Sequence, residues 1–179
     1  GIRHQYFLPD ETPAYERAID MLLKKINSEE FESELPIPEL DTVDIADAIK
    51  DLSSTTVALV TSGGIVPVEN PDNIQSASAT RWGKYYIEDV TRLKNRRSEA
   101  FKTIHAGYDP AAADTDPNRV VPVDAMRKYE REGKIGKLYK YFYSTVGTGT
   151  TQGEAARMGQ EIAAELLEDG VQAVILTST

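Results

Sequence analysis

Val57-Ala-Leu-Val60, running directly into Thr61-Ser-Gly-Gly64, is the stretch that decides the fold. A short, fully apolar run that ends in a loop of small polar residues is typical of a central parallel strand whose carboxyl end faces a ligand. The pattern returns three times: residues 101–105 lead into Ala106-Gly-Tyr-Asp109, residues 139–146 into Gly147-Thr-Gly149, and residues 171–176 into Thr177-Ser-Thr179. We therefore predict that these four strands, the last of them buried, belong to one parallel sheet and share one carboxyl edge.

Two segments with helical spacing lie between the last three strands. Residues 123–131 end before Gly133 and residues 154–168 end before Gly170, and glycine is the usual residue just past a helix. This order of elements predicts an α/β fold, with an open, mostly parallel, Rossmann-like sheet and flanking helices. Residues 65–100 depart from the order, and we predict a long irregular excursion there with a short strand at residues 84–87.

The first 54 residues are predicted to form an N-terminal helical arm, and residues 55–179 the parallel α/β domain, truncated at its C-terminus. Apolar residues at helical spacing predict a helix over residues 14–26. A second helix is predicted from Asp41 to about Lys50, with Val43, Ile45 and Ile49 as its apolar side.

Composition excludes several classes of function. Acidic residues outnumber basic ones by 29 to 20, and the resulting net charge of −9 argues against nucleic acid or an anionic membrane surface as the partner. The chain has no cysteine, so disulfides, thiolate metal sites and cysteine nucleophiles are excluded within these residues. No apolar run approaches the roughly 18 to 20 residues of a membrane span and no signal peptide opens the chain, so we predict a cytoplasmic protein.

The loop from Gly147 to Gly153 ends a predicted strand and opens a predicted helix, a place where backbone N–H groups can face an anion. The loop lacks the Lys-Ser/Thr pair of a phosphate-binding P-loop, and its third glycine comes one position late for a dinucleotide fingerprint. We therefore favour a tight turn that faces a small substrate or a partner.

His105 and Arg119 are the candidate reactive and anchoring side chains. His105 follows an apolar strand, so its imidazole is expected at the ligand-facing edge, where it either acts on a ligand or only bonds to a loop carbonyl. Arg119 precedes an apolar stretch and either binds a substrate carboxylate through two N–H groups or pairs with a nearby aspartate. Asp109, Asp114 and Asp116 lack the spacing of a calcium loop, which favours capping and turn roles; no metal site is expected.

These segments together resemble the selenoprotein B subunit of the clostridial glycine, sarcosine and betaine reductases, a family that also includes the D-proline reductase selenoprotein. The matching stretches occur in family order: Ala58-Leu-Val-Thr-Ser-Gly-Gly64, His105-Ala-Gly-Tyr-Asp109, Asp116-Pro-Asn-Arg-Val-Val-Pro-Val-Asp124, Glu132-Gly-Lys-Ile135, Tyr141-Phe-Tyr-Ser-Thr-Val-Gly147 and Gly170-Val-Gln-Ala-Val-Ile-Leu-Thr-Ser-Thr179.

The resemblance implies that a catalytic selenocysteine follows Thr179. Its UGA codon, read as a stop, would account for a chain that is expected to halt in mid-fold. The implied reaction is reductive cleavage of a C–N bond: a selenolate attacks the substrate α-carbon, the amine leaves, and a selenium-bound carboxymethyl group results. The implied partners are a pyruvoyl-containing subunit of component B, selenoprotein A as carboxymethyl acceptor and, indirectly, the thioredoxin system. The cofactor is the pyruvoyl group on the partner subunit, with none in this segment.

The resemblance also implies roles for individual residues. Thr177, Ser178 and Thr179 present the nucleophile and contact the substrate, and His105 is the candidate proton donor to the leaving amine. The remaining candidates for substrate binding are Gly63, Gly64, Tyr108, Arg119, Gly147 and Gly149. A non-catalytic domain that binds a small molecule, or a scaffolding domain, remains the alternative; the choice among glycine, sarcosine and betaine is open.

Overall fold

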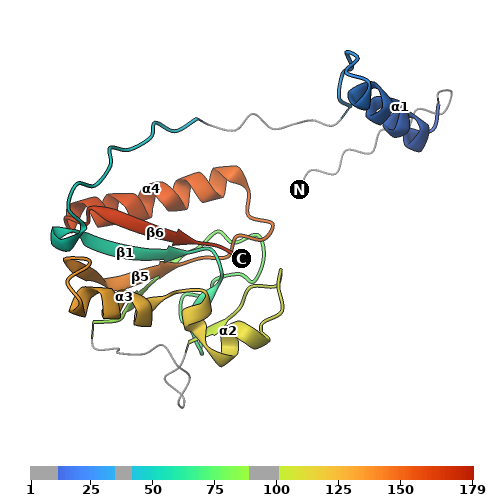
Figure 1. The fold of residues 1–179 in the computed structure, drawn as a ribbon. Helices are drawn as coiled ribbons and strands as arrows, with labels where there is room; N and C mark the ends of the chain where they lie inside the picture. Colours follow the sequence, from blue (N-terminus) through green and yellow to red (C-terminus); the bar gives the residue numbers. More distant parts are fainter. Residues whose placement is uncertain (1–11, 35–41, 89–100) are drawn as a thin grey trace. The chain divides into compact units, whose positions relative to one another are not determined.

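The computed structural model describes residues 12–34, 42–88 and 101–179 (Figure 1). Contacts divide the chain into two compact units, residues 1–48 and residues 49–179. Asp41, where a second helix is predicted to begin, lies outside the described residues.

The first unit contains one described helix, α1 (Ala14–Ile26), at the predicted bounds. Glu16 in its first turn and Lys24 and Lys25 in its last turn complement the helix dipole. The predicted second helix was wrong, because residues 42–50 have no helical structure. Val43 and Ile45 are 85% and 98% exposed, so no packing compensates for the low helix propensity of β-branched residues.

The second unit is a mixed α/β structure around a four-stranded sheet with the order β3-β5-β1-β6. Strands β1 (Thr56–Thr61), β5 (Lys137–Ser144) and β6 (Ala173–Thr177) run parallel, with β1 in the middle. Strand β3 (Gly83–Tyr86) joins the other side of β5 in the antiparallel direction, so the predicted short strand exists. The predicted open, mostly parallel sheet is thereby confirmed.

One predicted member of this sheet lies elsewhere. Strand β4 (Phe101–Thr103) pairs antiparallel with β2 (Ile65–Pro67) in a separate two-stranded sheet. The prediction of one parallel sheet containing residues 101–105 was therefore wrong. Phe101 and Thr103 are buried and Lys102 between them is not, which is the alternation of a strand with one solvated face.

Helices cover both faces of the four-stranded sheet (Figure 1). Helix α4 (Gln152–Glu168) packs Ile162 and Leu166 against Ala58 and Val60 of β1. Helices α2 (Ala111–Thr115) and α3 (Val123–Arg131) and the short helices η1 (Leu52–Ser54) and η2 (Pro117–Arg119) belong to the rest of the unit. The larger core on the α3 side is built from residues such as Leu59, Ile65, Val123, Met126 and Phe142. Each fully buried side chain of this size contributes about 1.5–3 kcal/mol.

Strand β6 is an exposed edge strand in the described chain, which corrects the prediction of a buried strand. Val174, Ile175 and Leu176 are 48%, 36% and 73% exposed. Their apolar character suits a central strand, but no described strand pairs with the far side of β6. The sequence pattern is therefore typical of a strand with a neighbour on each side, and the described residues supply a neighbour on one side.

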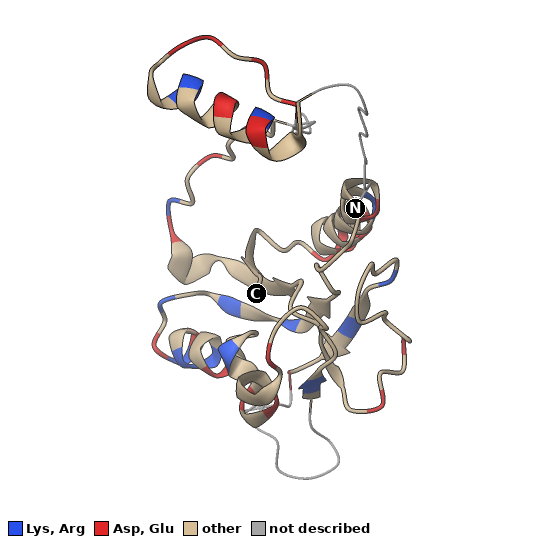
Figure 2. Cartoon of the chain, turned by 90° about the vertical axis from the view of Figure 1, so that its right-hand side faces the viewer, with Lys and Arg blue, Asp and Glu red and all other residues tan. Residues whose placement is uncertain are grey.

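Charged side chains lie on separate elements of this unit. Figure 2 shows its described Lys and Arg residues spread over strands, helix α3 and loops. The partly buried Lys84 pairs with Glu165 of α4 at 2.7 Å and ties the antiparallel strand to the helix. Among the described residues no helix has both the length and the apolar character that crossing a membrane requires.

Candidate functional site

The loops that follow β1, β5 and β6 meet at one edge of the sheet. The amide of Ser62 donates to the carbonyl of Thr177 at 3.0 Å, which ties the loop after β1 to the end of β6. The amides of Gly64 and Gly147 donate to Thr145 and Ser62, both at 2.9 Å, which ties the same loop to the chain after β5. The prediction that Gly64 and Thr179 lie at the same edge is confirmed.

Gly63 is the most crowded position at this edge. A Cβ built there would lie 2.4 Å from Cγ1 of Val120 and 3.2 Å from Cγ2 of Thr179. The buried Val120 directly follows η2, so the absence of a side chain at residue 63 lets this segment and the C-terminal Thr179 approach the backbone closely.

Gly64 places His105. Its φ of +69° is a conformation that suits glycine, and a Cβ there would lie 3.0 Å from Val146 Cγ2 and from both N and Cβ of His105. The carbonyl of Gly64 accepts from the amide of Ile104 at 2.9 Å. Although β4 is not part of the parallel sheet, this contact still brings His105 to the predicted edge.

His105 is buried and held as a neutral imidazole. Its exposed fraction is 8%, and burial lowers the pKa of its ring below the ordinary value, although a backbone hydrogen bond acts in the opposite direction. The amide of Gly107 donates to Nδ1 at 3.0 Å. Because Nδ1 accepts this bond, the ring proton belongs on Nε2, and the imidazole offers an N–H donor there.

The hydroxyl of Tyr108 is hydrogen-bonded to the backbone of Gly63. Its hydroxyl lies 3.0 Å from the carbonyl oxygen of Gly63 and 2.8 Å from Oγ1 of Thr103, which itself lies 3.1 Å from that carbonyl. Burial is the main reason that the pKa of Tyr108 is raised, so the hydroxyl keeps its proton as a donor. Thr103 and Tyr108 thus fix the position of Gly63, and sequence reasoning did not identify Thr103.

A segment of the irregular excursion, residues 76–81, closes over the loop after β5. The amide of Ser78 donates to Thr148 O at 2.7 Å, and the amide of Ala79 donates to Thr150 Oγ1 at 3.0 Å. A Cβ on Gly149, whose φ is +68°, would lie 2.8 Å from Ser78 Oγ. The turn at Gly147 and Gly149 therefore exists, and it contacts a segment that the sequence showed only as a run of small residues.

Arg119 ends η2, next to the Val120 that packs at Gly63. Its side chain is exposed.

The aspartates of this region accept hydrogen bonds from backbone amides, as the prediction of capping and turn roles expected. Asp109 accepts from the amide of Ala111, Asp116 from the amide of Asn118 and Asp114 from the amide of Thr103. Across residues 12–34, 42–88 and 101–179, no group of three or more His, Cys, Asp or Glu side chains is arranged to hold a metal ion.

Thr177, Ser178 and Thr179 lead out of the sheet at this edge. The Thr177 carbonyl accepts from Ser62, and Ser178 and Thr179 are exposed. The site therefore consists of a fixed backbone frame around Gly63, a neutral histidine beside Gly64, and a chain segment that leaves the sheet next to Gly63.

The family description "Glycine/sarcosine/betaine reductase selenoprotein B (GRDB)" matches residues 1–179. The chain belongs to this family. Over 179 residues it is 64% identical to the betaine reductase complex component B subunit beta of Peptoclostridium acidaminophilum. It is 55% identical to the glycine reductase complex component B subunit gamma of Carboxydothermus hydrogenoformans and 53% identical to the sarcosine reductase complex component B subunit beta of P. acidaminophilum.

Each of these three alignments covers 100% of this chain and 40% of the relative, so the chain spans well under half the length of the selenoprotein B relatives it matches. No solved structure matches the chain. Family membership confirms the resemblance to the selenoprotein B subunits.

Proposed function

We propose that these 179 residues form the part of a selenoprotein B subunit that presents the catalytic residue of a glycine, sarcosine or betaine reductase complex. The observation that carries the proposal is the position of Thr179, beside Gly63 at the carboxyl edge of the sheet, in a chain that belongs to this family. Ligands of open α/β sheets bind at this edge.

The frame fits a selenocysteine directly after Thr179. The methyl group of Thr179 lies 3.2 Å from the point that a Cβ on residue 63 would occupy, so the next residue begins beside the loop after β1. A selenolate there would supply the nucleophile for C–N cleavage at neutral pH. The chain itself contains no cysteine, so we expect the 179-residue piece alone to be inactive.

The chain's own residues would bind and orient the substrate. The exposed guanidinium of Arg119 has the donors for a carboxylate, a group that glycine, sarcosine and betaine share. Gly147 lies beside the loop that holds Gly63 and Gly64, because its amide donates to the carbonyl of Ser62, and the end of β6 at Thr177 lies on the other side of that loop. Tyr108 holds the Gly63 carbonyl and so acts as a positioning residue.

His105 is proposed as the proton donor to the leaving amine. The lowered pKa of its imidazole sets a condition on this role, because a neutral ring has to gain a proton when the substrate binds before it can release one. Without that gain, Nε2–H serves as a hydrogen-bond donor that orients the substrate.

The pyruvoyl-containing subunit, selenoprotein A and the thioredoxin system are the proposed partners, in line with the reductase complexes that the relatives' names describe. The pyruvoyl group would come from the partner subunit.

Kinetics of the complete subunit in its complex test the roles. Arg119→Lys should raise KM, since an ammonium replaces a planar group with two aligned donors. Lys102→Arg, which changes a partly exposed cation of β4, serves as the control. His105→Gln should lower kcat by roughly 10² to 10⁴ with little change in KM if the ring donates a proton.

Betaine provides an internal comparison, because its trimethylamine leaves as a neutral base that needs no proton during cleavage. A betaine reductase should tolerate His105→Gln better than a glycine reductase does. Equal losses in both enzymes would assign His105 to positioning, and normal kinetics in every variant would favour a domain that only binds or scaffolds.

A further inference from the structure

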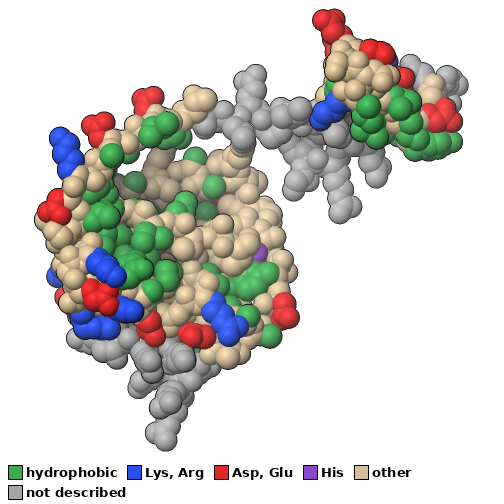
Figure 3. Space-filling view, viewed as in Figure 1, with side chains coloured by type: hydrophobic (Ala, Val, Ile, Leu, Met, Phe, Trp, Pro, Cys, Tyr) green, Lys and Arg blue, Asp and Glu red, His purple; other side chains and the backbone are tan. Residues whose placement is uncertain are grey.

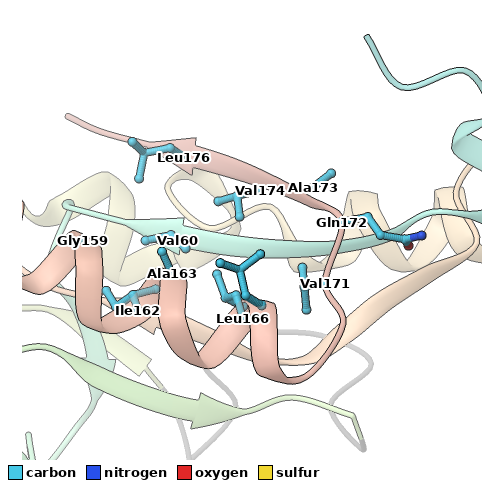
Figure 4. A pocket seen from close by; sticks show the side chains of 11 residues that line it. Val60, Gly159, Ile162, Ala163, Leu166, Val171, Gln172, Ala173, Val174 and Leu176 are labelled. Atoms are coloured by element: carbon cyan, nitrogen blue, oxygen red, sulfur yellow. The ribbon is translucent and has the colours of Figure 1, made fainter. Parts of the chain in front are cut away.

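An apolar groove of about 500 Å³ runs between α4 and β6, on the side of the sheet that α4 covers (Figure 4). Val174 and Leu176 of β6 form one wall, and Ala163 and Leu166 of α4 form the other (Figure 4). Leu167, at the rim, is 74% exposed, and Leu176 is 73% exposed. Apolar side chains in such a continuous arrangement are usually covered in a folded protein.

The exposed surface of α4 beside this groove suits a second helix. Gly159, Ala163 and Leu167 follow one another at intervals of four residues, so they share one side of the helix, and all three are exposed. Small residues at the first two positions permit close approach of a neighbouring helix, and Leu167 offers a contact at the end of the row.

Strand β6 also lacks the charged residues and prolines that keep a natural edge strand from pairing with other strands. Its sequence, Ala173-Val-Ile-Leu-Thr177, contains no charge and no proline, and no described strand pairs with its outer side. An edge of this composition normally pairs with another strand. Figure 3, in the orientation of Figure 1, likewise shows hydrophobic side chains gathered at the surface over the strands of the sheet.

Topology indicates which element fits the groove. The connection from β5 through α4 to β6 passes over β1, because β1 lies between the other two strands. A further parallel strand beyond β6 would continue in the same direction across the sheet. Since such connections are right-handed, its crossover helix would lie on the same face as α4, which is the face with the groove.

We propose that the groove and the free edge of β6 bind the continuation of the same polypeptide beyond Thr179, as a helix beside α4 followed by a strand parallel to β6. The chain spans 40% of the length of its selenoprotein B relatives, so enough polypeptide exists for this unit. Thr179 lies two residues past β6, at the edge where such a connection begins. This inference concerns packing and does not rest on the proposed function.

Hydrogen exchange of the complete polypeptide, purified without other subunits, tests the proposal. We expect the outward-facing amides of β6 to exchange at least about 10²-fold more slowly than those of the exposed residues 68–69, because a paired strand opens only with the surrounding structure. Fast exchange in β6 would overturn the proposal. Protection that develops only with dimer formation at higher concentration, or only after other subunits are added, would also overturn it.

A matched pair of substitutions gives a second readout in the complete polypeptide. Val174→Lys should lower Tm by several degrees, because the charge would lie under the covering helix, whereas Val68→Lys places the same charge on a valine of similar exposure, 38% against 48%. Equal, small shifts in Tm would show that the groove is open in the complete polypeptide and would contradict the proposal. If the Val174 variant does not fold, hydrogen exchange of the unaltered chain still decides.

Discussion

The methyl group of Thr179 lies 3.2 Å from the point that a Cβ on Gly63 would occupy, although 116 residues separate the two in the chain. The contact joins the end of the polypeptide segment to the loop after the central strand. Tyr108 and Thr103 hold that loop by the Gly63 carbonyl, so the position of Thr179 depends on a preformed backbone frame. Positions of this kind suit a residue whose geometry determines a reaction.

Gly63→Ala should therefore destabilise the α/β unit by about 1–3 kcal/mol and displace Thr179, because the added methyl overlaps Val120. Thermal unfolding and turnover of the complete subunit measure the two effects. Gly153→Ala is the control, since a Cβ at that helical position meets nothing within 4 Å. Identical behaviour of the two variants would show that Gly63 is not a close-approach position.

Tyr108→Phe should cost about 1–2 kcal/mol in the free energy of unfolding, because the hydrogen bond to the Gly63 carbonyl is lost while the ring contact with His105 remains. Denaturant unfolding measures the loss. Tyr129→Phe, which removes the hydroxyl of a 42% exposed tyrosine, should change stability by less than about 0.5 kcal/mol. A loss no larger than that of the control would show that the Tyr108 hydroxyl does not stabilise the position of Gly63.

The pKa of His105 predicts a pH dependence of stability. Because burial lowers the pKa in the folded state, the unfolded chain binds more protons once the pH falls below about 6.5, the ordinary imidazole value. The stabilisation is complete above that pH and is lost as the pH falls through the folded-state pKa. NMR titration should show a ring that stays neutral below pH 6.5, with His4→Gln used to assign the second histidine. A normal or raised pKa would contradict the buried, neutral state.

Thr150→Val should loosen the contact between residues 76–81 and the turn after β5. The Thr150 hydroxyl donates to Val146 O at 2.7 Å and accepts from the Ala79 amide, so the substitution removes both bonds. We expect a loss of about 1–3 kcal/mol and faster hydrogen exchange at Ala79. Thr115→Val, which removes one exposed bond within α2, should leave Ala79 unaffected. Unchanged exchange at Ala79 in the Thr150 variant would show that other contacts hold the segment.

Much of the sheet and the shared edge could be predicted from local patterns. Burial and helix capping depend on a few neighbouring residues, so their patterns can be recognised in the sequence. They identified the apolar strands at residues 57–60, 139–146 and 171–176 and the helices that end before Gly133 and Gly170. The pairing of β4 with β2 could not be read from Phe101–Thr103 alone, since partner choice depends on the whole chain.

The frame around the site was harder to predict than the site's position. His105 was located correctly at the edge, but Thr103 looked like an ordinary strand residue, because its bond to Gly63 spans 40 residues. The helix predicted from Asp41 was wrong because spacing alone does not stabilise a helix. Its apolar residues have helical spacing, but Val43 and Ile45 are exposed and have no surface to pack against.

The chemical identity of the residue that follows Thr179 is the most direct test of the central claim. The complete subunit is treated with iodoacetamide at about pH 6, where a selenol is ionised and an ordinary thiol, with a pKa near 8.5, is not. Tandem mass spectrometry then locates the alkylated position. We expect one dominant modification, with the isotope pattern of selenium, on the residue directly after Thr179. An unmodified, non-nucleophilic residue at that position, with the alkyl group elsewhere in the chain, would contradict the central claim.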